Sequence, residues 1–329
     1  MSGPDVTDTL DEHLQPTTTV SGRSRPLLAR EHRSPKRILG VLAVLGFAVP
    51  LCAYIWLLAH YSVNTIYADQ WSDVRLVGLA HSGHLSLSAL WAQHNENRIF
   101  FPNLIMLFLA YTTNLNLLVE MYLGAAMLVA SVGFFVLAHK RRSPGRNWIY
   151  YCPVAILMLS FVQFQNTLWG FQMAWYFVLL CLSVSLYFLD GESLSWQMFS
   201  VAIIAAVVGS FSSLQGLLIW PAGLVLLYHR RRHGVHVLTW IGFAAATAAL
   251  YFYNMAFNPA NGFAYRGYAL HHPIMALKFF VYMLGAMVVD VQSPHPSVDA
   301  VLFFGIVVLV VAAIVVAACG LRRDDVGPA

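Results

Sequence analysis

Residues 38–63 read ILGVLAVLGFAVPLCAYIWLLAHYSV, a stretch without Asp, Glu, Lys or Arg. An α-helix rises about 1.5 Å per residue, so roughly 20 apolar residues cross the ~30 Å hydrocarbon core of a bilayer. The stretch starts too late and is too long to be the apolar part of a cleavable signal peptide. We therefore expect it to form a first transmembrane helix that is not removed.

The rest of the chain has the same apolar character. Hydrophobic residues make up 59% of the 329 residues, charged residues only 10%, and the mean hydropathy is +0.65. Soluble domains are about a quarter charged, so the excess apolar surface must face lipid. Further apolar runs cover residues 99–111, 116–139, 148–163, 171–189, 196–211, 214–228, 235–257, 273–290 and 300–320. The sequence thus predicts an all-α, polytopic transmembrane bundle.

Basic clusters set the expected topology. Cationic residues are enriched in cytoplasmic loops, and an Arg-rich stretch ends the polar segment 1–37, which we expect to be a disordered cytoplasmic tail. Lys140–Arg142, Arg230–Arg232 and Arg322–Arg323 should also be cytoplasmic. This requires that the runs 99–111 and 273–290 do not cross. About eight spans result, with ten as the alternative. The predicted organisation is a tail (1–37), a membrane domain (38–320) and a second cytoplasmic tail (321–329).

Several classes of protein and site are disfavoured. The net charge of +4 comes from basic residues at the ends of segments, so nucleic-acid binding is not expected. Cys52, Cys152, Cys181 and Cys319 lie in apolar runs without a CxxC motif, which is typical of buried thiols. No cofactor is predicted; a divalent metal is compatible with the composition, but no motif indicates one.

The predicted first outer loop, residues 64–98, holds an unusual share of the charges, and its apolar residues favour short amphipathic helices at the interface. Carboxylates beside a lipid headgroup are candidate bases. The catalytic candidates are Asp69, Asp73 and Glu96, and the substrate-binding candidates in this loop are His94 and Arg98. The simpler interpretation is that the acids are solvated and that residues 94–98 cap a helix, with Arg98 reaching to the interface.

Other predicted outer segments carry amides, aromatics and cations. Amides and indole faces suit the hydroxyls and C–H faces of sugars, although an aromatic belt at the interface would use the same residues. The candidates for sugar contact are Gln165, Trp169, Gln172 and Gln215. Arg266 and Lys278, within the predicted outer segment 258–299, are candidates to bind a lipid phosphate.

Two stretches, Tyr67–Trp71 (YADQW) and His94–Pro102 (HNENRIFFP), resemble segments of the GT-C superfamily of membrane glycosyltransferases, of the protein-mannosyltransferase and aminoarabinose-transferase type. The resemblance implies that the first-loop acid, here Asp69, acts as general base, and that the donor is a polyprenyl-phosphate sugar used at the outer face of the cell membrane. The family often has paired acids where this chain has Asp69-Gln70, and many members are longer. A shortened or degenerate relative would show the same pattern.

Two other functions fit the same residues. A transporter or flippase of lipid-linked sugars would use similar cations and aromatics without a general base. Charges inside several spans would favour it, and Glu120 is the main instance. A structural subunit of a membrane complex would need no particular outer acid. The bilayer is the expected partner in every case.

Overall fold

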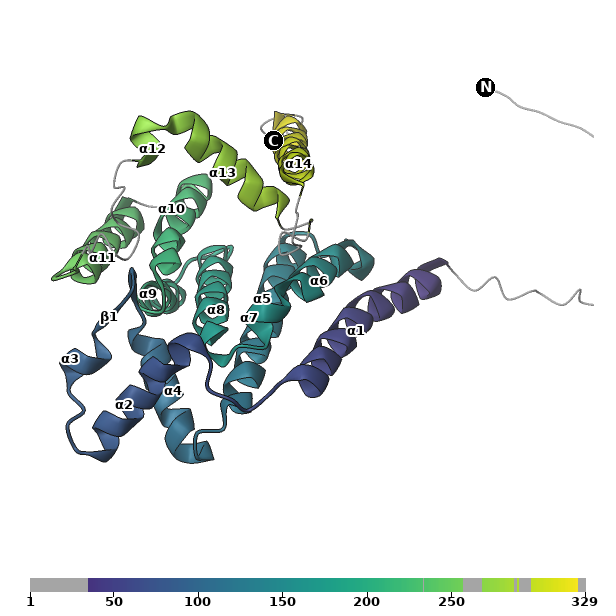
Figure 1. Ribbon diagram of the computed structural model, residues 1–329. Coiled ribbons are helices and arrows are strands. Elements are labelled where there is room, and N and C mark those ends of the chain that lie inside the picture. The colour runs from purple at the N-terminus through teal and green to yellow at the C-terminus, as the bar shows by residue number, and fades with distance from the viewer. Residues whose placement is uncertain (1–34, 233, 257–267, 287–288, 290–296, 325–329) are drawn as a thin grey trace, which may run out of the picture.

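The computed structural model describes residues 35–232, 234–256, 268–286, 289 and 297–324 (Figure 1). The two predicted tails therefore lie almost entirely outside the described residues, and so does Arg266. The first helix already begins at Pro35 and the last continues to Asp324, so helical structure extends a few residues into both of the expected tails.

The described chain is almost entirely helical, which confirms the predicted all-α class. Its one sheet is a two-stranded antiparallel hairpin, β1 (Gln93–His94) and β2 (Asn97–Arg98). The α-helices are α1 (Pro35–Tyr61), α2 (Trp71–His81), α3 (Leu87–Leu90), α4 (Phe100–Thr113), α5 (Leu117–Arg142), α6 (Cys152–Met158), α7 (Phe164–Thr167), α8 (Met173–Leu189), α9 (Trp196–Ser210), α10 (Ile219–His229), α11 (Gly234–Phe252), α12 (Tyr268–His271), α13 (Pro273–Gly285) and α14 (Val298–Asp324). Short 3-10 turns are η1 (Ala68–Gln70), η2 (Trp148–Tyr151), η3 (Phe161–Gln163), η4 (Gly170–Gln172) and η5 (Leu214–Leu218).

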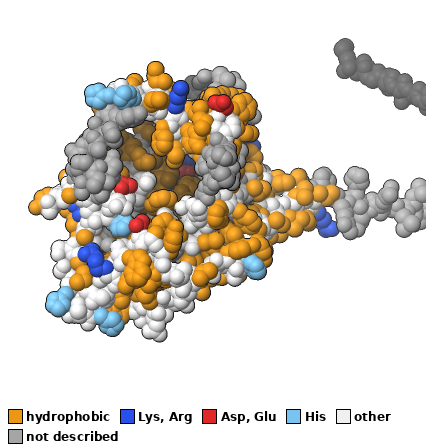
Figure 2. Space-filling model, in the orientation of Figure 1, with side chains coloured by type: hydrophobic (Ala, Val, Ile, Leu, Met, Phe, Trp, Pro, Cys, Tyr) orange, Lys and Arg blue, Asp and Glu red, His pale blue; other side chains and the backbone are white. Residues whose placement is uncertain are grey.

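The membrane character of the chain follows from helix length and exposed apolar surface. Within the described residues, five helical segments are long and apolar enough to cross a bilayer: Arg37–Tyr61, Leu117–Arg142, Trp148–Thr167, Gly170–Leu189 and Gly234–Phe252. Other apolar helices are shorter, and α4, with 14 residues, reaches only about 21 Å. Apolar side chains cover much of the visible surface and most of α1 (Figure 2). The chain is therefore a membrane protein, while the count of eight spans stays a prediction.

The core of the bundle lies where α8 packs against α5 on one side and α9 on the other. Leu128 and Met173 are 1% exposed in the first contact, and Phe199 is fully buried in the second. A close approach at the end of α9 requires glycine, because a Cβ on Gly216 would clash with the backbone carbonyl of Gly209. The packing of apolar faces, rather than polar contacts, thus holds the middle of the bundle together.

Ion pairs connect the helices at one end of the bundle. Asp190, at the end of α8 and 5% exposed, forms an ion pair with Arg142 of α5 and accepts hydrogen bonds from Nε and Nη2 of Arg230, after α10, at 3.0 and 2.9 Å. Arg232 donates to the carbonyls of Gly191 and Glu192. The clusters 140–142 and 230–232 therefore share one end, as the charge pattern predicts; we call it the Asp190 end.

The first-loop elements occupy the opposite end, which we call the Asp69 end (Figure 1). The predicted short helices of this loop are present as α2 and α3. Asn64 anchors the loop, because its Oδ1 accepts from the backbone N–H of Leu117 at the start of α5 (2.9 Å). The helices α13 and α14 pack closely against each other, and Figure 1 shows α13 at the other end of the bundle from α2.

We expect Asp190→Asn to lower the free energy of unfolding by about 2 kcal/mol, because two guanidinium groups would lose their shared carboxylate. The loss stays below the ~3–5 kcal/mol of fully buried pairs, since both arginines reach water. Thermal unfolding of the purified protein in detergent measures the change. Glu192→Gln, an exposed acid of the same turn, should melt like the wild type; an unchanged Asp190→Asn variant would show that the pairs contribute nothing.

Candidate functional site

A tight turn before α2 positions three polar side chains at the Asp69 end. Ala68 has a positive φ of 46°, and the backbone N–H of Tyr67 donates to Oε1 of Gln70 (3.2 Å). The turn leaves Asp69 partly exposed, with 42% of its side chain accessible, and directs Gln70 into the protein, where it is 1% exposed. One turn of α2 later, Asp73 is also buried.

The buried carboxyl groups of Asp73 and Glu120 lie close to Asp69. Both carboxylate oxygens of Asp73 are buried without a hydrogen-bond partner in the described part of the chain. Burial raises the pKa of Asp73 to about 8, and the negative charges of Glu120 and Asp69 contribute to this rise. Asp73 is therefore protonated at neutral pH, so it carries no charge and can donate a hydrogen bond.

Glu120, at the start of α5, is 2% exposed and accepts from Nε2 of Gln70 (3.2 Å). Gly170 packs directly against this pair, since an added Cβ would lie 2.6 Å from Oε2 of Glu120 and 3.0 Å from Nε2 of Gln70. Glycine is required here for a close approach. From the sequence, Glu120 stood out as an acid near the end of an apolar helix, but that signal alone did not place it in the site.

The hairpin β1–β2 presents His94 to Asp69, with Nε2 of His94 3.5 Å from Oδ2 of Asp69. Asn95 takes a positive φ of 50° in the hairpin turn. The Nε2 atom is buried and makes no hydrogen bond within the described residues, while the imidazole ring lies 5.0 Å from Phe171. Residues 94–98 therefore form a hairpin rather than a helix cap, and one candidate base touches a second titratable group.

Aromatic rings form one wall of the site. Trp169 meets Tyr67 edge-on at 5.5 Å between centroids and stacks on Phe171 at 6.0 Å. Its indole Nε1 is buried without a hydrogen-bond partner in the part of the chain that the structure describes. An indole face is suited to stacking on the C–H face of a sugar ring. Gln172, 7% exposed, lies behind this wall in η4.

Arg98, one of the predicted substrate-binding residues, makes several contacts with the protein's own backbone. It is 3% exposed, and its Nε and Nη2 donate to the carbonyls of Tyr251 (2.6 Å) and Tyr253 (2.5 Å). Nη1 donates to the carbonyl of Trp91 (2.8 Å), whose ring lies 5.2 Å from the guanidinium carbon. The guanidinium thus donates hydrogen bonds to three backbone carbonyls and holds the hairpin against the end of α11.

A side-chain amide makes a second connection between the hairpin and the segment after α11. Nε2 of Gln93 donates to the carbonyl of Ala256, and Oε1 of Gln93 accepts from its backbone N–H, both at 2.8 Å. The hydroxyl of Tyr251 donates to the carbonyl of Glu96 (3.1 Å). Glu96, a predicted catalytic residue, is half-buried on the same turn.

The remaining predicted residues lie elsewhere. Gln215 lines a cavity of about 490 Å³ between α8 and α10, together with Gln163 and Asn166. Gln165 is exposed on α7, and Lys278 is exposed on α13, the helix that Figure 1 shows at the other end of the bundle. The structure thus brings together Asp69, Asp73, His94 and Trp169, but it does not bring Lys278 to them.

In the described residues, no group of three or more His, Cys, Asp or Glu side chains is arranged to hold a metal ion. Comparison with family models, with characterised proteins and with solved structures finds no match to this chain. Its function therefore has to be inferred from the chemistry of the Asp69 end.

We expect the stability of the wild type to fall as pH rises from about 4 to about 8. Over this range the folded protein keeps the proton of Asp73 that the unfolded chain releases, so raising the pH favours unfolding. Asp73→Asn should flatten this dependence, by up to roughly 5 kcal/mol for a pKa difference of this size. Melting temperatures at pH 5 and pH 8.5 measure it. Asp299→Asn, at an exposed position of α14, should show the same change of melting temperature with pH as the wild type. The same change in Asp73→Asn would contradict the raised pKa of Asp73.

Proposed function

We propose that this chain is a membrane glycosyltransferase that moves a sugar from a polyprenyl-phosphate donor to an acceptor hydroxyl at the extracytoplasmic face. One observation carries the proposal: a half-exposed carboxylate, Asp69, lies 3.5 Å from His94 beside the aromatic wall of Tyr67 and Trp169. A base, a group that orients it and a sugar-stacking surface are the parts that such a transfer needs. The resemblance of Tyr67–Trp71 and His94–Pro102 to GT-C enzymes supports the same reaction.

In the proposed mechanism, Asp69 accepts the proton of the acceptor hydroxyl while the hydroxyl oxygen attacks the anomeric carbon. The bond between that carbon and the phosphate oxygen breaks, the phosphate leaves with the electron pair, and the configuration inverts. The imidazole of His94 lies against the Asp69 carboxylate, with Nε2 3.5 Å from Oδ2. Asp73 stays protonated, so it adds no negative charge that would repel the departing phosphate.

Activity assays of Asp69→Asn test the mechanism. With a polyprenyl-phosphate sugar and the purified protein, we expect wild-type transfer and at least a ~100-fold lower rate in the variant, because the amide cannot accept the proton. Asp299→Asn, another exposed acid, should keep the wild-type rate. Transfer by Asp69→Asn at the full rate would exclude Asp69 as the base.

The proposal includes a topology in the cell membrane: about eight spans, a cytoplasmic N-terminus, and the Asp69 end outside. Single cysteines, introduced into a background in which all four native cysteines are replaced by Ser, test it with an impermeant thiol reagent on intact cells. Cysteines replacing Thr65 and His84, which are exposed at the Asp69 end, should react. Those replacing Gly145 and Glu192, exposed at the Asp190 end, should react only after permeabilisation. The reverse pattern would place the proposed site in the cytoplasm.

A transporter of lipid-linked sugars is the second candidate, and the buried carboxyl groups of Asp73 and Glu120 favour it. Buried acids at the edge of a membrane domain are typical proton-binding groups in transporters. Movement of an unmodified lipid-linked sugar across vesicles, lost in Asp73→Asn and retained in Asp69→Asn, would identify this function instead. A structural subunit would tolerate both substitutions.

A further inference from the structure

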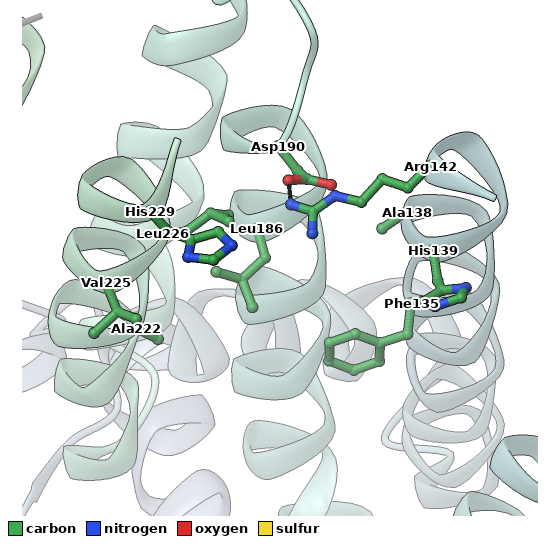
Figure 3. A pocket seen from close by; sticks show the side chains of 10 residues that line it. All are labelled: Phe135, Ala138, His139, Arg142, Leu186, Asp190, Ala222, Val225, Leu226 and His229. Atoms are coloured by element: carbon green, nitrogen blue, oxygen red, sulfur yellow. Dashed lines mark ion pairs between the residues drawn. The ribbon is translucent and has the colours of Figure 1, made fainter. Parts of the chain in front are cut away.

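Two cavities follow one face of α8: the first is lined by α5, α8 and α10, and the second by α8, α10 and the turns that hold Gln163 and Gln215. The first, of about 500 Å³, is at the Asp190 end (Figure 3). The second, of about 490 Å³, ends near Gln163 and Gln215, and Ala222 lines both cavities. The face is open to the surroundings, since Val225 on its α10 side is 68% exposed. Together the two cavities make a groove that runs along the helices.

The residues that α8 contributes show the direction of this groove. Trp175, Leu179, Leu182, Leu186 and Asp190 are spaced by three or four residues, so they form a single stripe on the helix. From Trp175 to Asp190 the stripe is about 22 Å long at 1.5 Å per residue. A length of this order exceeds one leaflet of a ~30 Å hydrocarbon core, so the groove is long enough for a lipid chain.

The chemistry of the groove changes where it reaches the Asp190 end. Its walls there are apolar, with Phe135, Leu186 and Val225 from the three helices. Its rim is polar: in Figure 3, Arg142 and His139 come from α5, His229 from α10, and Asp190 from α8 between them. An apolar channel with a polar rim at the ends of its helices matches the two parts of a phospholipid.

The Asp190 end as a whole carries more positive than negative charge. Asp190 pairs with both Arg142 and Arg230, so one carboxylate faces two guanidinium groups. The same end has seven Lys or Arg residues in 140–146 and 230–232, against the two carboxylates Asp190 and Glu192. His139 is held beside the groove by the contact of its Nδ1 with the hydroxyl of Tyr151 (3.0 Å). The charge of this end as a whole therefore attracts an anionic headgroup toward the rim.

Apolar walls line about 500 Å³ of space in the first cavity. A flexible, apolar acyl chain can follow such a space while its headgroup stays at the polar rim.

We propose that the groove between α5, α8 and α10 binds one anionic phospholipid from the leaflet at the Asp190 end. Its phosphate lies at the rim formed by Arg142, His139 and His229, and one acyl chain fills the groove toward Ala222. The site is at the opposite end of the bundle from Asp69, and its occupancy does not depend on sugar transfer.

Lipid retention by the purified protein tests the proposal. The protein in neutral detergent is titrated with dioleoyl phosphatidylglycerol or dioleoyl phosphatidylcholine, and bound lipid is counted by native mass spectrometry together with the melting temperature. We expect one retained phosphatidylglycerol per chain, with a melting temperature several degrees higher than in phosphatidylcholine. Arg142→Gln should weaken retention about tenfold. Ala222→Phe, which keeps every charge and fills the groove, should weaken it as much.

Arg231→Gln is the matched control, because it removes an exposed cation of the same end that does not line the cavity. It should retain the lipid like the wild type. If Arg142→Gln does not fold, the comparison of Ala222→Phe with Arg231→Gln decides alone. Equal loss in Arg231→Gln, equal retention of the two lipids, full retention by Ala222→Phe, or the same stabilisation by inorganic phosphate would each overturn the proposal.

Discussion

The carboxylate of Asp190 is the charge on which the arrangement of the bundle depends. It joins the ends of α5, α8 and the turn after α10, and the described part of the chain has few other ion pairs, so this contact fixes how far these helices slide along one another. A helix is rigid along its length, so the Asp190 contact also determines how the opposite ends of these helices lie relative to one another. Glu120 and Gln172 lie at those ends. Apolar packing alone would leave this register less defined, since it is non-directional.

The buried carboxyl groups at the two ends of the bundle have different surroundings. Asp190 is paired with two arginines, whereas Asp73 is buried without a partner among the described residues and keeps its proton at neutral pH. Burying an unpaired carboxylate is costly, and proteins retain such groups mainly at functional sites. The contrast is the reason to look for chemistry at the Asp69 end and for binding of anions at the Asp190 end.

Helix positions and the grouping of the basic clusters could be predicted from the sequence, because they depend on local hydropathy and on charge at the ends of segments. The amphipathic helices after residue 64 were predictable for the same reason. The role of Arg98 was not, since its carbonyl partners Tyr251 and Tyr253 are distant in the chain. The pairing of Gln70 with Glu120 likewise depends on a contact between distant segments, which no local pattern encodes.

The amide of Gln93 pairs with both backbone groups of Ala256, and Arg98 holds the carbonyls of Tyr251 and Tyr253. The hairpin is therefore coupled mechanically to the final turn of α11 and to the residues immediately after it. Since His94 sits on that hairpin against Asp69, a shift of the chain beyond α11 will change the spacing of the two side chains. Residues 253–256 are thus linked through the hairpin to the contact between His94 and Asp69, although they contribute no side chain to that contact.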